Sequence, residues 1–523
     1  MKRIIAIMIS LTLLLSLCAC TNNLKDKPEQ QLTETVNETV ANNDTEVKEE
    51  VPAQVRTDLR IYSDLEPDTL DQDVSVSTSI LFRNLYSNLY RINSNNSIVP
   101  ELAETYTVNE DFTEYTFTIR TDMLFSDGTP ITAQDVKFTY ERAMAADNDY
   151  FIGIESVEAP DDKTVIIKLL EPNNSFLSDM TGEHMAVMSR AAVEGGMDVA
   201  NCPNITSGAY YVDSWDKENH IIHLKGNPYF NGTGPDITDV TIYYKLEESI
   251  YEALRNGTID YATNIGNDSE DIPYLRVAEG IDLIPYDNCS WNFISLNQLH
   301  PQFADDNVRS AIVSALDVNY IISAALSGQG TPAPLMIMPA IAGYLPGFDD
   351  SPYDVKKARE YMAASNYPDG FKMKLEIADV SGAAIAEAVK TLLKEIKIDV
   401  EIVEEDGNTL VDNALTGNYE AVFLSYSMYS GHVSHAIPLF SNGELHISNG
   451  DDTEIGDLLQ KSLAVNEKER DRLLSEAYTM MREKWSYIGL YWITVHDAKV
   501  EKLKLREPIT SERYILSNMY WEQ

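Results

Sequence analysis

Segments with the periodicity of a β-strand alternate with segments that have the periodicity of an α-helix along most of this chain. Tyr115–Arg120 places apolar and polar side chains alternately, as in a strand with one buried face. Thr132 then precedes a helical pattern that runs to Ala143, where its hydroxyl can cap the first turn and Asp135 adds negative charge. This alternation predicts an α/β fold. The same criteria predict strands at 58–62, 293–297, 400–404 and 488–495, and helices at 79–90, 308–316, 384–393 and 453–483.

The chain is strongly acidic. Its 523 residues include 83 acidic side chains against 40 Lys and Arg, for a formal net charge of -43. Nucleic-acid binding depends on clustered basic residues, so we expect no nucleic-acid partner. The same charge would repel an anionic membrane surface. With 44% hydrophobic residues the composition is that of a folded protein, and the length predicts two or three domains.

The first twenty residues form a signal-like segment. Lys2 and Arg3 precede the apolar run Ile4–Leu17, which is shorter than the roughly 20 residues needed to span a bilayer. The run ends on Leu17–Cys20, which resembles the lipobox of bacterial lipoproteins. The resemblance implies that residues 1–19 are removed as a signal peptide and that Cys20 carries the lipid anchor. An ordinary secretory signal is the alternative.

Residues 20–56 are expected to be a lipidated N-terminus followed by a flexible acidic tether. The stretch from Thr21 to Arg56 is polar and has no aromatic residue, so it cannot bury enough apolar area to offset the entropy of ordering. Beyond it only Cys202 and Cys289 remain. They could form a disulfide or be two ordinary buried thiols, and no spacing typical of a zinc site is present.

A series of short motifs then resembles one family in order along the chain. The series resembles the solute-binding proteins of peptide and nickel ABC transporters, the oligopeptide- and dipeptide-binding family 5. The motifs that carry the resemblance are Pro100–Glu104, Phe125–Val136, Thr206–Tyr210, Gly226–Phe230, Leu254–Asp260, Leu296–Asp317, Tyr353–Ala358 and Tyr367–Phe371.

This resemblance implies a two-lobed periplasmic-binding-protein-like fold, type II of the large cluster, with a hinge between the lobes. Lobe I would comprise residues 57–293 with 501–523 returning to it, and lobe II would comprise 294–500. The first crossing is expected near 289–297 and the second near Val500. The lobes would close around a ligand bound between them.

The resemblance also implies a function without catalysis. The sequence has no GxSxG, HExxH, Walker A or GxGxxG motif, so we expect neither an enzyme nor a cofactor. The expected protein is an extracytoplasmic lipoprotein of an ABC importer that captures oligopeptides or similar solutes. Its partners would be a membrane permease and ATPase subunits, and it would be a monomer that contacts the membrane through its lipid anchor only.

The expected ligand loop departs from the family pattern. Peptide-binding members have a loop resembling Trp-x-x-Asp-Tyr-x-Asp-Pro, whose first aspartate pairs with the ammonium group of the ligand. Here Tyr426 stands at the tryptophan and Tyr429 at the aspartate, and no acidic residue lies from Ala421 to Gly443. The candidate ligand contacts are Tyr426, Ser427, Tyr429, Ser430 and His432 in this loop, Ser77 and Thr78 in lobe I, and Trp291 at the crossing strand.

Several alternatives remain open at these positions. Ser77 and Thr78 could instead cap a helix, and Trp291 could be a core residue. A peptide could be held through its backbone, or the loop could bind a sugar or a metal chelate. For the metal alternative, His432 and His435 are the candidate nickel ligands, since imidazole suits first-row metals. A receptor that senses peptides without transporting them is a third possibility.

Overall fold

The computed structural model describes residues 56–522 except 76–79, 94–96, 147, 149–150, 152, 267–268, 340, 428–431, 444 and 509–514, and only the backbone of 289 and 379–381. The predicted signal peptide and Cys20 lie outside the described residues, as does the predicted tether apart from Arg56. No single helix among the described residues is long and apolar enough to cross a membrane, and one bent pair, Asp306–Ala315 with Val318–Ala325, meets that test by length and composition.

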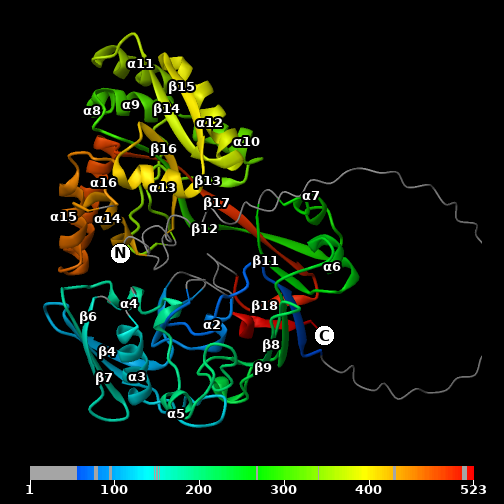
Figure 1. The fold of residues 1–523 in the computed structure, drawn as a ribbon. Helices are drawn as coiled ribbons and strands as arrows, with labels where there is room; N and C mark the ends of the chain where they lie inside the picture. The colour runs from blue at the N-terminus through cyan, green and yellow to red at the C-terminus, as the bar shows by residue number, and fades with distance from the viewer. Residues whose placement is uncertain are drawn as a thin grey trace, which may run out of the picture.

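An eleven-stranded sheet runs through both halves of the molecule (Figure 1). Its order is β15-β14-β16-β12-β17-β11-β1-β10-β9-β8, with β13 paired to β17 beside this path. The strands are β1 Asp58–Tyr62, β8 Tyr210–Asp216, β9 Ile221–Gly226, β10 Asp239–Tyr243, β11 Tyr261–Ile265, β12 Ile281–Leu296, β13 Gly330–Pro332, β14 Phe371–Ala378, β15 Ile398–Glu405, β16 Ala421–Ser427 and β17 Tyr487–Val500.

The long antiparallel strands β12 and β17 connect the two lobes. They pair from Ile281 opposite Val500 to Ser295 opposite Tyr487, with a break in register between residues 287 and 291 of β12. Along these strands, the buried side chains pass from the apolar core of one lobe to that of the other. Tyr286 and Val495 belong to the core of the first lobe, whereas Trp291 and Trp492 belong to that of the second. The chain therefore crosses between cores at the irregular part of the ladder.

The first lobe contains the β1, β8–β11 end of the large sheet and a separate four-stranded sheet. That second sheet has the order β4-β5-β7-β6 and its own apolar core, against which α3 packs. A short hairpin, β2 with β3, and the C-terminal pair, β18 with β19, complete the lobe. The remaining elements are β2 Tyr90–Ile92, β3 Ile98–Pro100, β4 Ala103–Val108, β5 Glu114–Ile119, β6 Ile154–Glu158, β7 Thr164–Leu169, β18 Leu503–Leu505, β19 Met519–Trp521, α2 Phe82–Leu85, α3 Ala133–Ala145, α4 Phe176–Asp179, α5 Arg190–Glu194, α6 Ile250–Asn256 and α7 Ile272–Leu275.

The second lobe places helices around strands β14, β15 and β16. Its single apolar core joins these strands to the helices, so that the lobe folds as one α/β unit. The helices are α8 Pro301–Ala304, α9 Asp306–Ala315, α10 Val318–Ala325, α11 Val355–Ala364, α12 Asp379–Leu393, α13 Gly407–Thr416, α14 Ile437–Phe440, α15 Thr453–Ser462 and α16 Glu467–Lys484.

The lobes also touch at a point away from the crossing strands. Asn174, just before α4 of the first lobe, contacts the turn between α15 and α16 of the second. Its backbone N–H donates to the Leu463 carbonyl at 2.7 Å, and its side-chain amide donates to the carbonyls of Ser462, at 2.8 Å, and Val465. This interlobe contact ties α4 to the α15–α16 turn, which lie next to each other in Figure 1.

Most elements predicted from local pattern are confirmed. Strand 58–62 is β1, strand 115–120 is β5, and strand 400–404 lies within β15. Thr132 caps α3, and its backbone N–H donates to the Asp135 carboxylate in a capping box. Helices 308–316 and 384–393 correspond to α9 and α12.

Three predicted elements differ from the structure. The helix expected at 79–90 is reduced, among the described residues, to Phe82–Leu85, because the Leu85 carbonyl accepts from Gly208 and the chain then turns into β2. The helix expected at 453–483 is two helices, since Asn466 caps a new one with its side chain. The strand expected at 293–297 is the end of a much longer one, β12.

Candidate ligand-binding site

The candidate site lies at the carboxyl end of β16, beside the point where β12 leaves the second lobe. Ser427, the last residue of β16, pairs with Ser290 of β12, and their hydroxyl oxygens are 3.1 Å apart. β16 also runs parallel to β14. Ligands of α/β sheets bind outside the carboxyl ends of parallel strands. The predicted contact Ser427 is therefore at a position from which a solute could reach both lobes.

Tyr426 holds the loop that follows β16. Its side chain is 6% exposed, and its hydroxyl donates to the carbonyl of His435 at 2.9 Å. The bond ties the short helix η6, Val433–Ala436, back onto the end of the strand. In this conformation Tyr426 positions the loop, and its predicted contact with a ligand stays a prediction.

His432 caps the same short helix. Its Nδ1 atom accepts from the Ser434 N–H at 3.0 Å and lies 2.8 Å from the Ser434 hydroxyl, so the ring proton is on Nε2. The side chain is 3% exposed. Burial lowers the pKa of His432 to about 3, and the positive charge of Arg470 acts in the same direction. His432 is neutral at neutral pH and already uses one nitrogen in the cap.

The metal alternative gains no support from the described residues. Burial lowers the pKa of His435 to about 4, so this imidazole is also neutral and chemically able to bind a metal. Yet no group of three or more His, Cys, Asp or Glu side chains in the described part of the chain is arranged to hold an ion. Cys202 is a free thiol whose sulfur lies 3.7 Å from the Val212 carbonyl.

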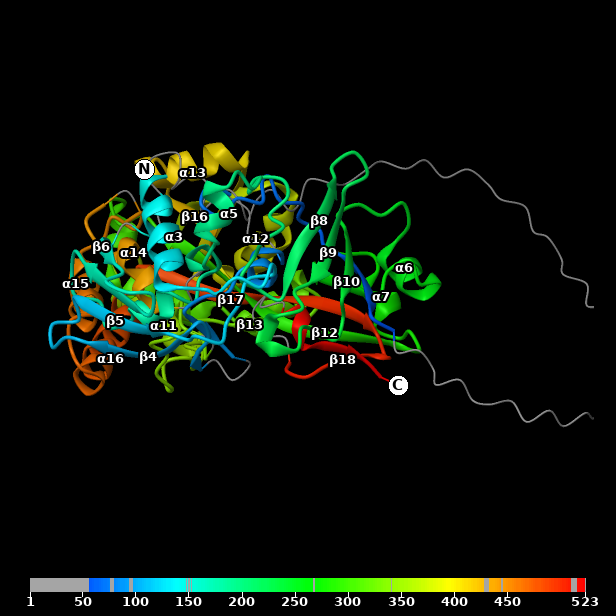
Figure 2. The ribbon, with the colours of Figure 1, turned by 90° about the horizontal axis from the view of Figure 1, so that it is seen from below.

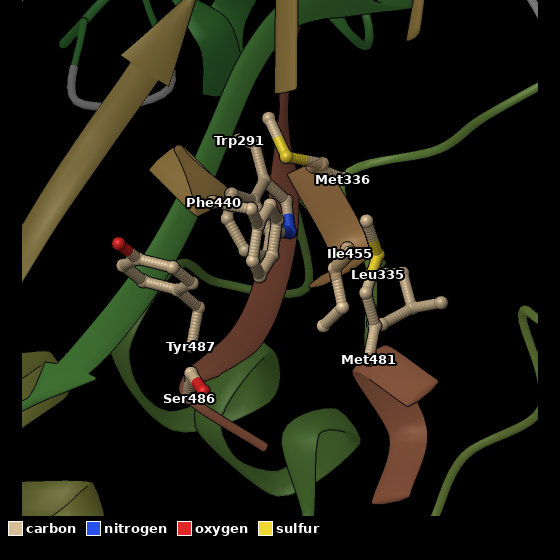
Figure 3. A pocket seen from close by; sticks show the side chains of 8 residues that line it. All are labelled: Trp291, Leu335, Met336, Phe440, Ile455, Met481, Ser486 and Tyr487. Atoms are coloured by element: carbon tan, nitrogen blue, oxygen red, sulfur yellow. The ribbon is translucent and has the colours of Figure 1, made fainter. Parts of the chain in front are cut away.

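Trp291 lies in the core of the second lobe. The sequence allowed two locations for its side chain, the core or the ligand cleft. Trp291 is 2% exposed, stacks on Phe293 with ring centroids 4.6 Å apart, and donates its indole N–H to the Ala333 carbonyl. The void beside it has a volume of only about 10 Å³ and is bordered by Phe440 and Tyr487 among others (Figure 3). Such a void holds at most one water molecule. Trp291 thus packs the lobe in this conformation.

The other predicted contacts fall on segments outside the described residues. These are Tyr429 and Ser430 in the second lobe and Ser77 and Thr78 in the first. Directly before the latter pair, Ser75 is buried and donates its hydroxyl to Asp68 at 2.8 Å. The segment leading to residues 77 and 78 is thus held to the first lobe by side-chain bonds.

A buried ion cluster that sequence reasoning missed supports the same segment. Arg142 of α3 pairs with both Asp71 and Asp73. Burial raises the pKa of Asp73 from 3.8 to about 6, although the positive charge of Arg142 opposes this shift. With 83 acidic residues in the chain, no sequence signal could have singled out these two.

The comparison with protein families decides the identity of the chain. The family model described as bacterial extracellular solute-binding proteins, family 5 Middle, matches residues 97–444. The chain belongs to this family. The resemblance seen in the sequence motifs is therefore confirmed, and the two-lobed α/β fold is the one expected for family 5.

Relatives of this family 5 protein extend the match to nearly the whole chain. It is 26% identical over 454 residues to the glutathione-binding protein GsiB of Salmonella paratyphi A, covering 82% of this chain and 86% of the relative. The unliganded open form of the murein tripeptide-binding protein MppA superposes with a TM-score of 0.79 at 21% identity, covering 89% and 97% of the two chains. The oligopeptide-binding protein AppA of Bacillus subtilis, in complex with a nonapeptide, gives a TM-score of 0.66 at 21% identity, covering 90% and 100%.

Proposed function

We propose that this family 5 protein is the lipid-anchored, extracytoplasmic receptor of an ABC importer and that it captures oligopeptides or peptide-like solutes. The observation that carries the proposal is the place of the loop after β16. It begins at Ser427, beside the crossing strand β12, in a protein whose family binds solutes. The relatives named above bind glutathione, a murein tripeptide and a nonapeptide, which supports a peptide-like ligand.

The two lobes provide the mechanism of capture. A solute that contacts the β16 loop of the second lobe and the segment after Ser75 of the first lobe binds the closed arrangement more tightly than the open one. Only such a difference in affinity can shift the equilibrium toward closure. The crossing strands β12 and β17 would carry the motion, since their ladder is irregular where the cores change. Closure then presents one defined surface to a permease.

The composition of the β16 loop predicts how a peptide is held. No acidic residue lies between Ala421 and Gly443, so this loop offers no carboxylate for the ammonium group of a peptide. Affinity would then come from backbone hydrogen bonds and apolar contacts, with the ammonium group left in water. A peptide should lose little affinity when its N-terminus is acetylated.

A pair of peptides and one variant test this point. Small-angle scattering and calorimetry would follow a peptide ligand and its N-acetylated form. We expect both to compact the protein, with dissociation constants within about threefold of each other. Tyr429→Asp restores an acid at the position that carries one in the family pattern. It should favour the free N-terminus over the acetylated one by about tenfold, which is about 1.4 kcal/mol.

Two results would contradict the proposal. If no member of a broad peptide library produces compaction or raises the melting temperature, the ligand is not a peptide. If wild-type protein already prefers the free N-terminus by more than about thirtyfold, a carboxylate elsewhere binds the ammonium group.

The lipid anchor, the partner subunits and the monomeric state belong to the same proposal. Replacing Cys20 by Ser should release the protein from the membrane fraction. Deleting the gene should abolish uptake of the labelled peptide, whereas a receptor that only senses peptides would leave uptake unchanged. Light scattering should give the mass of a single chain.

A further inference from the structure

A second cavity lies on the other side of the crossing strands from the candidate site. Its volume is about 560 Å³, which is in the range of small-molecule sites. β12 and β17 supply part of its lining, and the rest comes from the end of α7 in the first lobe and from the loop 327–329 before β13 in the second. The cavity therefore has walls from both lobes.

Strand pairing fixes its position relative to the candidate site. β16 pairs with β12, whereas β13 pairs with β17, so the β16 loop and the loop before β13 flank opposite edges of the crossing ladder. In Figures 1 and 2, α7 lies toward the end of β12 and β17 in the first lobe, and α14 lies toward their end in the second lobe. A molecule in this cavity would not occupy the proposed peptide site.

The lining carries one unpaired charge. Arg276, which follows α7, is exposed and makes no ion pair with any described residue. The other charged lining residue, Asp282, is paired with the buried Lys499. In a chain with twice as many acids as bases, a guanidinium group left without a carboxylate at a cavity wall is a site for an anion, because it offers paired N–H donors.

Polar groups without partners stand beside this arginine. His496 lines the cavity, is 4% exposed, and its Nδ1 atom is buried without a hydrogen-bond partner among the described residues. Burial lowers the pKa of His496, and Arg276 adds to the effect, so the ring is neutral and can donate and accept. The exposed Ser327 likewise makes no hydrogen bond through its hydroxyl within the described structure.

Gln329 and Thr494 add further polar side chains to the lining, and four other residues make one part of it apolar. Leu275, Ile281, Leu283 and Pro285 form a wall next to Arg276. An occupant that satisfies both parts needs a compact anionic group and a short apolar body.

We propose that this cavity is a second ligand site, which binds a small amphipathic carboxylate with its anionic group on Arg276 and its apolar part on the wall from Leu275 to Pro285. Its occupant touches the loop 327–329 as well as the first lobe, so it favours one angle between the lobes. This second part rests on the proposed closure. Binding of the carboxylate and of the peptide must then affect each other by the same factor.

Hexanoate is a suitable probe, with hexanamide as its uncharged counterpart and inorganic phosphate as a charge without an apolar body. Ligand-observed NMR and calorimetry would compare wild type with Arg276→Gln. We expect hexanoate to bind wild type with a dissociation constant of about 10 mM or lower. Arg276→Gln should bind hexanoate about tenfold or more weakly than wild type does. Wild type should bind hexanamide and phosphate about tenfold or more weakly than it binds hexanoate.

Arg255→Gln is the matched control, because it removes the same charge from the exposed surface of α6. It should bind hexanoate like wild type. The site is refuted if hexanoate does not bind at about 10 mM, if Arg276→Gln binds it equally well, or if a peptide ligand displaces it competitively. The first two results do not depend on whether peptides bind, so they leave the proposed function untouched.

Discussion

The buried cap formed by His432 leads to a prediction about acid stability. The folded protein keeps this imidazole neutral, with a pKa of about 3 against an ordinary value of 6.5. Below pH 6.5 the unfolded chain takes up a proton here and the folded protein does not. Stability is therefore fully present above pH 6.5 and is lost as the pH falls toward 3. At about pH 5 the loss is about 2 kcal/mol from this residue alone.

His432→Asn isolates this contribution. The asparagine side chain can still accept the Ser434 N–H and cap η6, but it does not titrate. We expect the variant to lose about 2 kcal/mol less than wild type between about pH 7.5 and about pH 5 in urea unfolding. The stability of the variant should still decrease as the pH falls, because burial also lowers the pKa of His435.

Two further variants complete the test. His432→Ala removes the cap and should lower stability at neutral pH by about 1 kcal/mol relative to His432→Asn. His223→Asn, at a half-buried histidine of β9 in the first lobe, is the control for the same substitution made away from the β16 loop. If His432→Asn and wild type lost equal stability on acidification, the buried neutral imidazole would not explain the pH dependence.

Three other variants probe the two lobes and their connection. The Asp73 carboxyl binds its proton more tightly in the folded protein than in the unfolded chain, so wild type should lose about 3 kcal/mol of stability between pH 3.8 and about 6. Asp73→Asn should not show this loss. An equal dependence of the free energy of unfolding on pH in both proteins, measured with urea, would contradict the expectation. Asn174→Ala removes two side-chain hydrogen bonds between the lobes and should increase the radius of gyration of the ligand-free protein in scattering, where no change would mean that the contact does not restrain the lobes. Gly489→Ala places a Cβ atom 2.1 Å from the Ala333 carbonyl oxygen and should cost about 3 kcal/mol, so an unchanged melting temperature would refute that packing.

Elements whose signals are local could be predicted from the sequence. The capping box of Thr132 and Asp135 lies within four residues, so the start of α3 needs no distant partner. β12 shows the opposite case. Pro285 and Asp287 interrupt its apolar alternation, and the strand extends through them because β17 pairs alongside. Long-range pairing of this kind leaves no mark in the local pattern.

The sequence predicts which segment holds the ligand site, but it does not predict the surroundings of the individual side chains. The motif series pointed to the segment after β16, which the structure places beside the crossing strand. For Trp291, alternation says only that the ring faces one side of a strand, and it does not say whether that side is core or cleft. The ion cluster around Arg142 joins residues about 70 positions apart, which one sequence cannot reveal.

The C-terminal strand has a consequence for the order in which the chain is completed. β19 pairs with β18, and the indole N–H of Trp521 donates to the Asp58 carbonyl, while Arg56 lies 4.0 Å above its ring. The first lobe thus joins the start of the described chain to its last residues, with the second lobe nested between them. During synthesis the second lobe can finish folding while the first still lacks its closing strand. A chaperone that protects this protein during synthesis must therefore cover the first lobe for longer than the second lobe.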